Sequence, residues 1–181
     1  MNTTVVAVVA PEDEKPLDGV RGANVRTVRT IETEPEAPAL DRAMAAYQTA
    51  QRTRAPYLLH DADPLAAVAD AWARRFEGTG PAGELEVAVS ETLARWRARS
   101  LDLPDYYLVV DPEALSPTLR HWYLGVLGSA APARVVAGQP STPVADQLGT
   151  LRSGPWWPEL DRLLDGIDEV VPDQAGLPAR I

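Results

Sequence analysis

The sequence predicts an α/β protein. We expect three layers around an open, mainly parallel sheet of about five strands, with helices on both faces and a Rossmann-like or flavodoxin-like topology. Three observations lead to this prediction. Short apolar runs alternate with longer amphipathic stretches along the 181 residues. A capping residue followed by proline repeatedly stands between a run and the next stretch. The first run has no polar alternation, as expected for a strand buried on both faces.

The first half of the chain supplies three strands and one helix. Residues 3–10 are a β-branched apolar run. Residues 24–31 alternate apolar and polar side chains, which predicts an edge strand. Apolar side chains then recur at helical spacing, which predicts a helix over residues 39–54. Residues 56–60 form the third, shorter strand.

The same alternation continues to the end of the chain. Two further strands are predicted at residues 106–110 and 134–137. Helices are predicted at residues 64–77, 83–100, 117–127, 143–152 and 159–165. Because parallel neighbours need long crossover connections, helices placed between strands favour a parallel sheet.

Three helices are predicted to begin at a capping residue followed by proline. These pairs are Asp63-Pro64, Ser116-Pro117 and Thr142-Pro143. The side-chain oxygen accepts a hydrogen bond from a free amide of the first turn, and proline has no amide to leave unpaired.

Composition limits the classes of protein. The length predicts a single domain over residues 1–172 with a loosely ordered tail over 173–181. There is no cysteine, which excludes disulfides, thiolate metal sites and a cysteine nucleophile, and two histidines are too few for a three-histidine zinc site. The net charge of −9 argues against binding to nucleic acid or anionic membranes. With no charged leader and no apolar run near the ~18 residues of a membrane span, we expect a cytoplasmic protein.

Acidic residues follow three of the predicted strands. Glu12 to Glu14 follow the first strand, Asp61 and Asp63 the third, and Asp111 the fourth. Ligands of open parallel sheets bind beyond the carboxyl ends of the strands. Carboxylates suit Mg²⁺ or Mn²⁺, which would orient a phosphate. One hypothesis is therefore a metal site at Asp61, Asp63 and Asp111, with His60 transferring a proton.

A simpler explanation accounts for the same residues. Asp63 is a helix cap, Asp61 and Asp111 are turn formers at strand ends, and Glu12 to Glu14 belong to a solvated loop.

The segment from Tyr57 to Asp63 also resembles the strand-then-Asp-x-Asp element of two families. These are the A-type nucleotide-sugar glycosyltransferases and the haloacid dehalogenase phosphatases. The resemblance spans seven residues, and we assign neither family.

Tryptophans suggest a different role. Trp156 and Trp157 lie between two prolines, and Trp122 lies on a predicted helix. A stiff aromatic loop either folds onto the core or presents a patch to a partner. We therefore take Trp156, Trp157 and Trp122 as candidate partner-binding residues.

Three functions from different classes follow. The favoured one is a non-catalytic interaction or self-associating module, with a protein partner or a second copy. The alternative is an Mg²⁺- or Mn²⁺-dependent enzyme or ligand binder for a phosphorylated or nucleotide-like small molecule. A third is a small-molecule sensor that uses the same crevice without chemistry. The missing glycine-rich phosphate loop and the scarcity of histidine and lysine favour the first.

Overall fold

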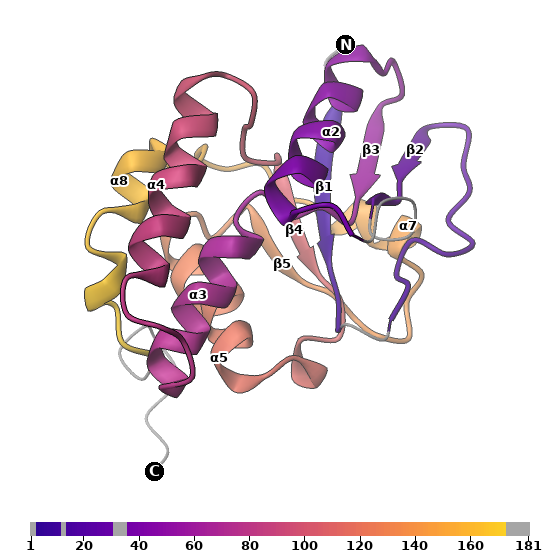
Figure 1. Ribbon diagram of the computed structural model, residues 1–181. Coiled ribbons are helices and arrows are strands. Elements are labelled where there is room, and N and C mark those ends of the chain that lie inside the picture. Colours follow the sequence, from indigo (N-terminus) through magenta and orange to yellow (C-terminus); the bar gives the residue numbers. More distant parts are fainter. Residues whose placement is uncertain (1–2, 12–13, 31–35, 173–181) are drawn as a thin grey trace.

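A parallel sheet forms the centre of the molecule (Figure 1). The computed structural model describes residues 3–11, 14–30 and 36–172. All four strand pairings are parallel, in the order β2-β3-β1-β4-β5. The strands are β1 (Thr4–Val9), β2 (Val25–Val28), β3 (Tyr57–His60), β4 (Tyr106–Val109) and β5 (Val135–Ala137). The predicted α/β fold is confirmed, while the predicted tail over residues 173–181 lies outside the described residues.

The central position of β1 explains its sequence. Val6 pairs with Leu59 of β3 on one side and with Tyr106 of β4 on the other. Both faces of β1 are covered, so it needs no polar alternation. The half-polar β2 lies at the sheet edge, as predicted. Compared with the 3-2-1-4-5 order of Rossmann sheets, β2 and β3 are exchanged, so β1 pairs with β3.

The longer helices pack on one face of the sheet (Figure 1). The helices are α2 (Ala39–Arg52), α3 (Ala66–Glu77), α4 (Glu84–Arg97), α5 (Pro117–Arg120), η2 (His121–Leu127), α6 (Gly128–Ala130), α7 (Val144–Gln147) and α8 (Leu160–Leu164). Helices α3 and α4, the π-helix η2 and helix α8 bury their apolar side chains against Ala7, Tyr107 and Val109. Short 3₁₀ turns are η1 (Pro112–Ala114), η3 (Leu148–Thr150) and η4 (Ile167–Glu169).

The opposite face has a thinner cover. Val6, Val8 and Leu108 point to this side and pack against Leu17 of the coil before β2. Val144 and Leu148, from α7 and η3, complete this second core. Helices therefore lie on both faces, as predicted, but the two layers are unequal.

The predicted helix starts are only partly right. Ser116 caps α5, because its hydroxyl accepts a hydrogen bond from the Leu119 amide at 3.2 Å. Asp63 was expected to cap a helix that begins at Pro64, but α3 begins at Ala66. The Asp63 side chain still accepts the expected hydrogen bond, from the Leu65 amide at 2.8 Å, in the turn before α3. Thr142 was also expected to be a cap, and α7 begins at Val144 without a side-chain cap. The Thr142 prediction is wrong, and the Asp63 prediction is right in the bond but not in the helix start.

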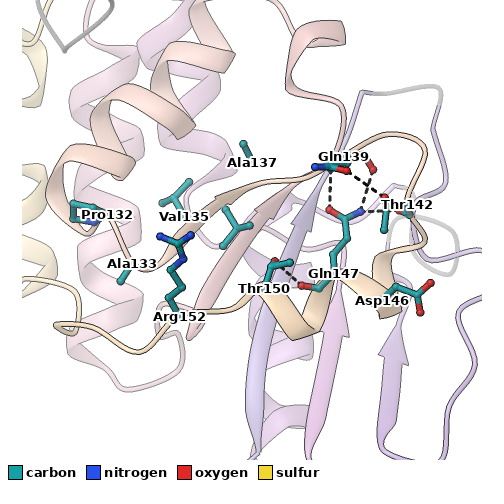
Figure 2. A pocket seen from close by; sticks show the side chains of 11 residues that line it. Pro132, Ala133, Val135, Ala137, Gln139, Thr142, Asp146, Gln147, Thr150 and Arg152 are labelled. Atoms are coloured by element: carbon teal, nitrogen blue, oxygen red, sulfur yellow. Dashed lines mark hydrogen bonds between the residues drawn. The ribbon is translucent and has the colours of Figure 1, made fainter.

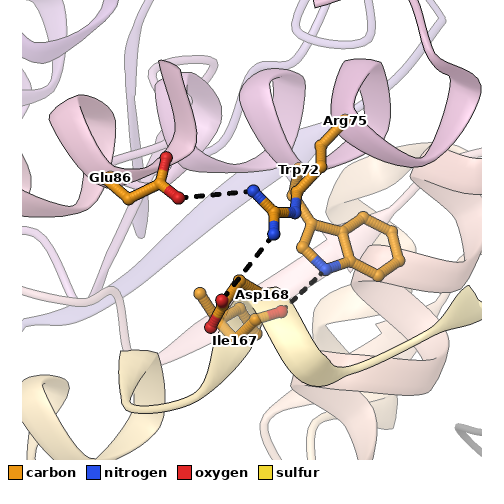
Figure 3. Close-up of polar contacts among 5 residues, drawn as sticks. All are labelled: Trp72, Arg75, Glu86, Ile167 and Asp168. Carbon is orange, nitrogen blue, oxygen red and sulfur yellow. Dashed lines mark hydrogen bonds and ion pairs between the residues drawn. The ribbon is translucent and has the colours of Figure 1, made fainter. Parts of the chain in front are cut away.

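Residues after α8 close the helical layer (Figure 3). The buried indole of Trp72 donates to the Ile167 carbonyl at 3.1 Å. Arg75 lies 3.3 Å from Glu86 of α4 and 3.7 Å from Asp168 of η4. Exposed ion pairs contribute little to the free energy of unfolding, so the buried hydrogen bond from the Trp72 indole is the stronger interaction. It joins α3 to a segment 95 residues later in the chain.

Among the helices of the described residues, none combines the length and apolar character that crossing a bilayer requires.

Candidate functional site

Asp61, Asp63 and Asp111, the three predicted metal ligands, do not form one cluster. Asp61 follows β3 and Asp111 follows β4, and the carboxyl ends of these parallel strands meet at one edge of the sheet. However, β1 lies between them, which separates their strands by two spacings, or ~9.6 Å. The Asp61 Oδ1 atom accepts hydrogen bonds from the amide and the hydroxyl of Thr30, at 2.7 and 2.9 Å. Asp61 therefore ties β3 to the end of β2.

Asp63 turns away from the sheet edge and into the helical layer. Its Oδ1 atom accepts hydrogen bonds from the Leu65 amide at 2.8 Å and from the Tyr107 hydroxyl at 2.7 Å. Its Oδ2 atom accepts one from the Tyr123 hydroxyl at 2.7 Å. Burial raises the pKa of the Asp63 carboxyl, and these three donors partly offset the rise. The carboxylate thereby joins the chain after β3 to β4 and to η2.

The π-helix η2 supplies one of these donors. It spans seven residues, and five of them are buried, including Tyr123. A π-helical segment is rare and frequently marks a functional position. Tyr123 of this segment donates to the Asp63 carboxylate. The sequence pattern predicted one regular helix over 117–127 and did not indicate the change to π-helical geometry.

A metal site remains a prediction. Among residues 3–11, 14–30 and 36–172, no three His, Asp or Glu side chains are grouped to hold a metal ion. Glu12 and Asp13 lie outside the described residues. Asp111 adopts a left-handed backbone conformation with φ 43°, which aspartate tolerates in turns. Asp61, Asp63 and Asp111 all lie within these ranges and are not grouped in this way.

His60 is buried at the end of β3. Only 5% of its surface is exposed. Burial lowers the pKa of His60 from 6.5 to about 4, although the negative charge of Asp61 and the Ala62 backbone oppose the shift. The imidazole is therefore neutral near pH 7. Its Nδ1 atom is buried and finds no partner of hydrogen-bonding geometry in the described part of the chain.

The three candidate tryptophans have different environments. Trp122 is fully buried, and the indole of buried Trp157 donates to the Pro104 carbonyl at 2.7 Å. Trp156 is 52% exposed. A partner that meets the folded surface therefore reaches Trp156, whereas the other two rings stabilise the core.

Trp156 is held by a neighbouring arginine. The Arg134 guanidinium lies 4.7 Å from the centre of the Trp156 ring and 5.0 Å from that of Tyr106. The same side chain donates to the carbonyls of Gly154 and Pro155, at 2.8 and 3.0 Å. This arrangement fixes the loop before α8 against the start of β5.

A groove follows the outer side of β5 (Figure 2). Its volume is about 360 Å³, and all three residues of β5 line it. Arg152 and Asp146 lie toward opposite ends of the groove. Buried Gln147 shapes its wall, because its amide accepts from the Gln139 amide at 2.9 Å and donates to the Thr142 carbonyl at 2.7 Å.

No protein family model, curated protein or solved structure matches this chain. Function must therefore be inferred from the arrangement of its own residues. Sequence reasoning missed the groove beside β5. The predicted open sheet must have two edges, but the strand order, which the sequence did not indicate, decided that β5 forms one of them.

Proposed function

We propose that this protein is a non-catalytic interaction module that associates with a second copy of itself along β5. The observation that carries the proposal is the open backbone of β5 beside a groove with opposite charges at its two ends. The proposal keeps the function favoured by the sequence but moves the contact from the tryptophans to the sheet edge.

The hydrogen bonds of β5 show which backbone groups are open. Tyr107 donates its amide to the Arg134 carbonyl, and Gly138 donates to the Val109 carbonyl. Strand residues alternate in direction, so 134, 136 and 138 point their backbone groups toward β4. The amides and carbonyls of Val135 and Ala137 point away from the sheet. They are available to a further strand.

Features that protect sheet edges are weaker at β5 than at β2. Edge strands are commonly guarded by charged side chains, proline or a bulge. Exposed Arg26 lies within β2. Strand β5 consists of valine, valine and alanine. Pairing between two copies is therefore favoured at β5.

The charges near β5 suit an antiparallel pair around a two-fold axis. Such an axis places the start of one β5 opposite the end of the other. Arg152 lies near the start of β5, and Asp146 lies near Thr142, beyond its end (Figure 2). Each Arg152 would then face the partner's Asp146. Because the strand has three residues, we expect a weak dimer with a Kd of ~1 µM or weaker.

The sedimentation behaviour of charge-swapped variants tests this proposal. The wild type is expected to dimerise as its concentration rises. Arg152→Asp and Asp146→Arg each create two like-charge pairs, so each is expected to weaken dimerisation at least ~10-fold. The double variant restores opposite charges and is expected to recover the dimer. A wild type that stays monomeric at its highest soluble concentration overturns the proposal, as does a double variant no better than the single ones.

A proline variant provides a second, independent test. Ala137→Pro removes one outward amide but no bond to β4, since edge strands accept proline there. The variant is expected to melt like the wild type and to sediment as a monomer. If it dimerises normally, the contact lies elsewhere.

The alternative of an Mg²⁺- or Mn²⁺-dependent enzyme has less support, because Asp61 and Asp63 are engaged by Thr30 and by two tyrosines. A cytoplasmic location remains part of the proposal.

A further inference from the structure

An open hollow lies between α2 and the end of α4, away from β5. Its volume is about 370 Å³, which falls within the ~300–1,000 Å³ of pockets that hold small organic molecules. None of its lining residues lines the groove at β5, so ligand binding here would not depend on dimerisation. The lining residues are Tyr47, Trp96, Arg97, Arg99, Leu101 and Asp102.

Two positive charges line this hollow without an intramolecular partner. Arg97 and Arg99 are exposed, and neither guanidinium has an ion pair or a hydrogen bond within the described part of the chain. By contrast, the Arg74 guanidinium forms an ion pair with Glu84 of the same helix α4 at 2.6 Å. Asp102 is the single acidic residue among those that line the hollow, so the two arginines leave an excess of positive charge there.

The turn at the end of α4 brings the two arginines to one place. The Arg99 amide donates to the Trp96 carbonyl at 2.8 Å, and the Ser100 amide donates to the Arg95 carbonyl at 3.1 Å, which together form a Schellman motif. Side chains two positions apart on a regular helix do not face each other. Because the chain reverses at Arg99, which has φ 56°, Arg97 and Arg99 line the same hollow.

Arginine is an unfavourable residue at this point of the turn. Glycine is the usual residue there, because a side chain strains the left-handed conformation, and Gly78 fills the equivalent place after α3 with φ 69°. The attraction of cations to a helix C-terminus accounts for Arg95 and Arg97 in the last turn of α4. It does not require an arginine at the strained position. The strain at Arg99 therefore points to a role for its guanidinium beyond the fold.

Aromatic rings complete the lining. Tyr47 and Trp96 both line the hollow, and both are half-buried. Such rings give a planar ligand a surface on which to stack. Guanidinium groups bind phosphate oxygens through paired, charge-assisted hydrogen bonds, which a neutral ligand group cannot match.

We propose that this hollow binds a small phosphate monoester that carries an aromatic ring. The phosphate is held by Arg97 and Arg99, and the ring packs against Trp96 and Tyr47. Asp102 opposes the phosphate with one negative charge, but its Oδ1 atom is engaged by the Leu103 amide at 2.8 Å, and the two arginines outweigh it.

Three probes separate the phosphate from the ring. Phenyl phosphate, inorganic phosphate and benzyl alcohol are titrated separately into the full chain at pH 7.5 and constant ionic strength, with calorimetry and tryptophan fluorescence as readouts. Phenyl phosphate is expected to bind saturably and at least ~10-fold more tightly than either of the other two, a difference of about 1.4 kcal/mol. Equal affinities for phenyl phosphate and inorganic phosphate overturn the proposal, as does the absence of saturable binding.

Arg99→Gly separates binding from folding. The variant is expected to bind phenyl phosphate at least ~5-fold more weakly, because one guanidinium is lost. Its Tm is expected to stay at or above that of the wild type, because glycine relieves the left-handed strain. A lower Tm would show that Arg99 serves the fold, and an unchanged affinity would show that it does not contact the phosphate. Either result overturns the proposal.

Two arginines of the same helical turn provide a matched control. Arg97→Gln and Arg95→Gln each remove one positive charge from the last turn of α4, but Arg95 does not line the hollow. Arg97→Gln is expected to weaken phenyl phosphate binding at least ~5-fold, whereas Arg95→Gln is expected to weaken it less than ~2-fold. Equal losses would show a general effect of net charge and would overturn the site.

Discussion

Asp63→Ala is expected to lower the free energy of unfolding by ~3–5 kcal/mol. The substitution leaves the hydroxyls of Tyr107 and Tyr123 without their acceptor, and both tyrosines are buried. It also removes the acceptor of the Leu65 amide. Each unpaired buried polar group costs ~1–3 kcal/mol. Urea unfolding at pH 7 measures the loss.

Tyrosine variants in adjacent positions provide the control. Tyr107→Phe removes a buried donor to Asp63 and is expected to cost ~1.5–3 kcal/mol. Tyr106→Phe, one residue earlier, removes an exposed hydrogen bond to the Arg152 carbonyl and is expected to cost less than ~1 kcal/mol. If the two variants are equally stable, or if Asp63→Ala costs less than ~1 kcal/mol, the carboxylate does not hold the two layers together.

His60→Gln is expected to flatten the dependence of stability on pH between 6.5 and about 4. The unfolded chain protonates His60 near pH 6.5, whereas the folded chain does so near pH 4. Within this window the unfolded state binds the extra proton, so stability rises with pH and is lost as the pH falls. Each tenfold change in proton affinity is worth ~1.4 kcal/mol, which gives a loss of ~3 kcal/mol for the wild type.

Measuring both proteins across the same pH range isolates this effect. The raised pKa of Asp63 acts in the opposite direction, because the folded state then binds a proton more readily. That contribution is present in both proteins and cancels in their difference. Parallel curves of unfolding free energy against pH would contradict a neutral buried His60.

The candidate site was less predictable than the fold. The sequence placed Asp61 and Asp111 after parallel strands, which the structure confirms. It did not indicate that β1 separates them, because strand order depends on how crossovers pack. Asp63 was expected to be a cap, and it does accept from the nearby Leu65 amide, yet its other two partners are tyrosines 44 and 60 residues away. No local pattern encodes such contacts.

Trp156 and Trp157 show the same limit within two adjacent residues. Both are tryptophans in the same proline-flanked loop, but the Trp156 ring is exposed, whereas the Trp157 indole donates to the Pro104 carbonyl in the core. The difference arises from the direction in which the loop meets β4 and β5.

Local chemistry alone determined the series of strands and helices. Apolar periodicity and proline placement act over a few residues, so strands predicted at 56–60 and 106–110 appear as β3 and β4 almost unchanged. Tertiary structure alone decided the strand order, the open edge at β5 and the burial of His60. These depend on contacts between residues far apart in the chain, which form only when the layers pack together.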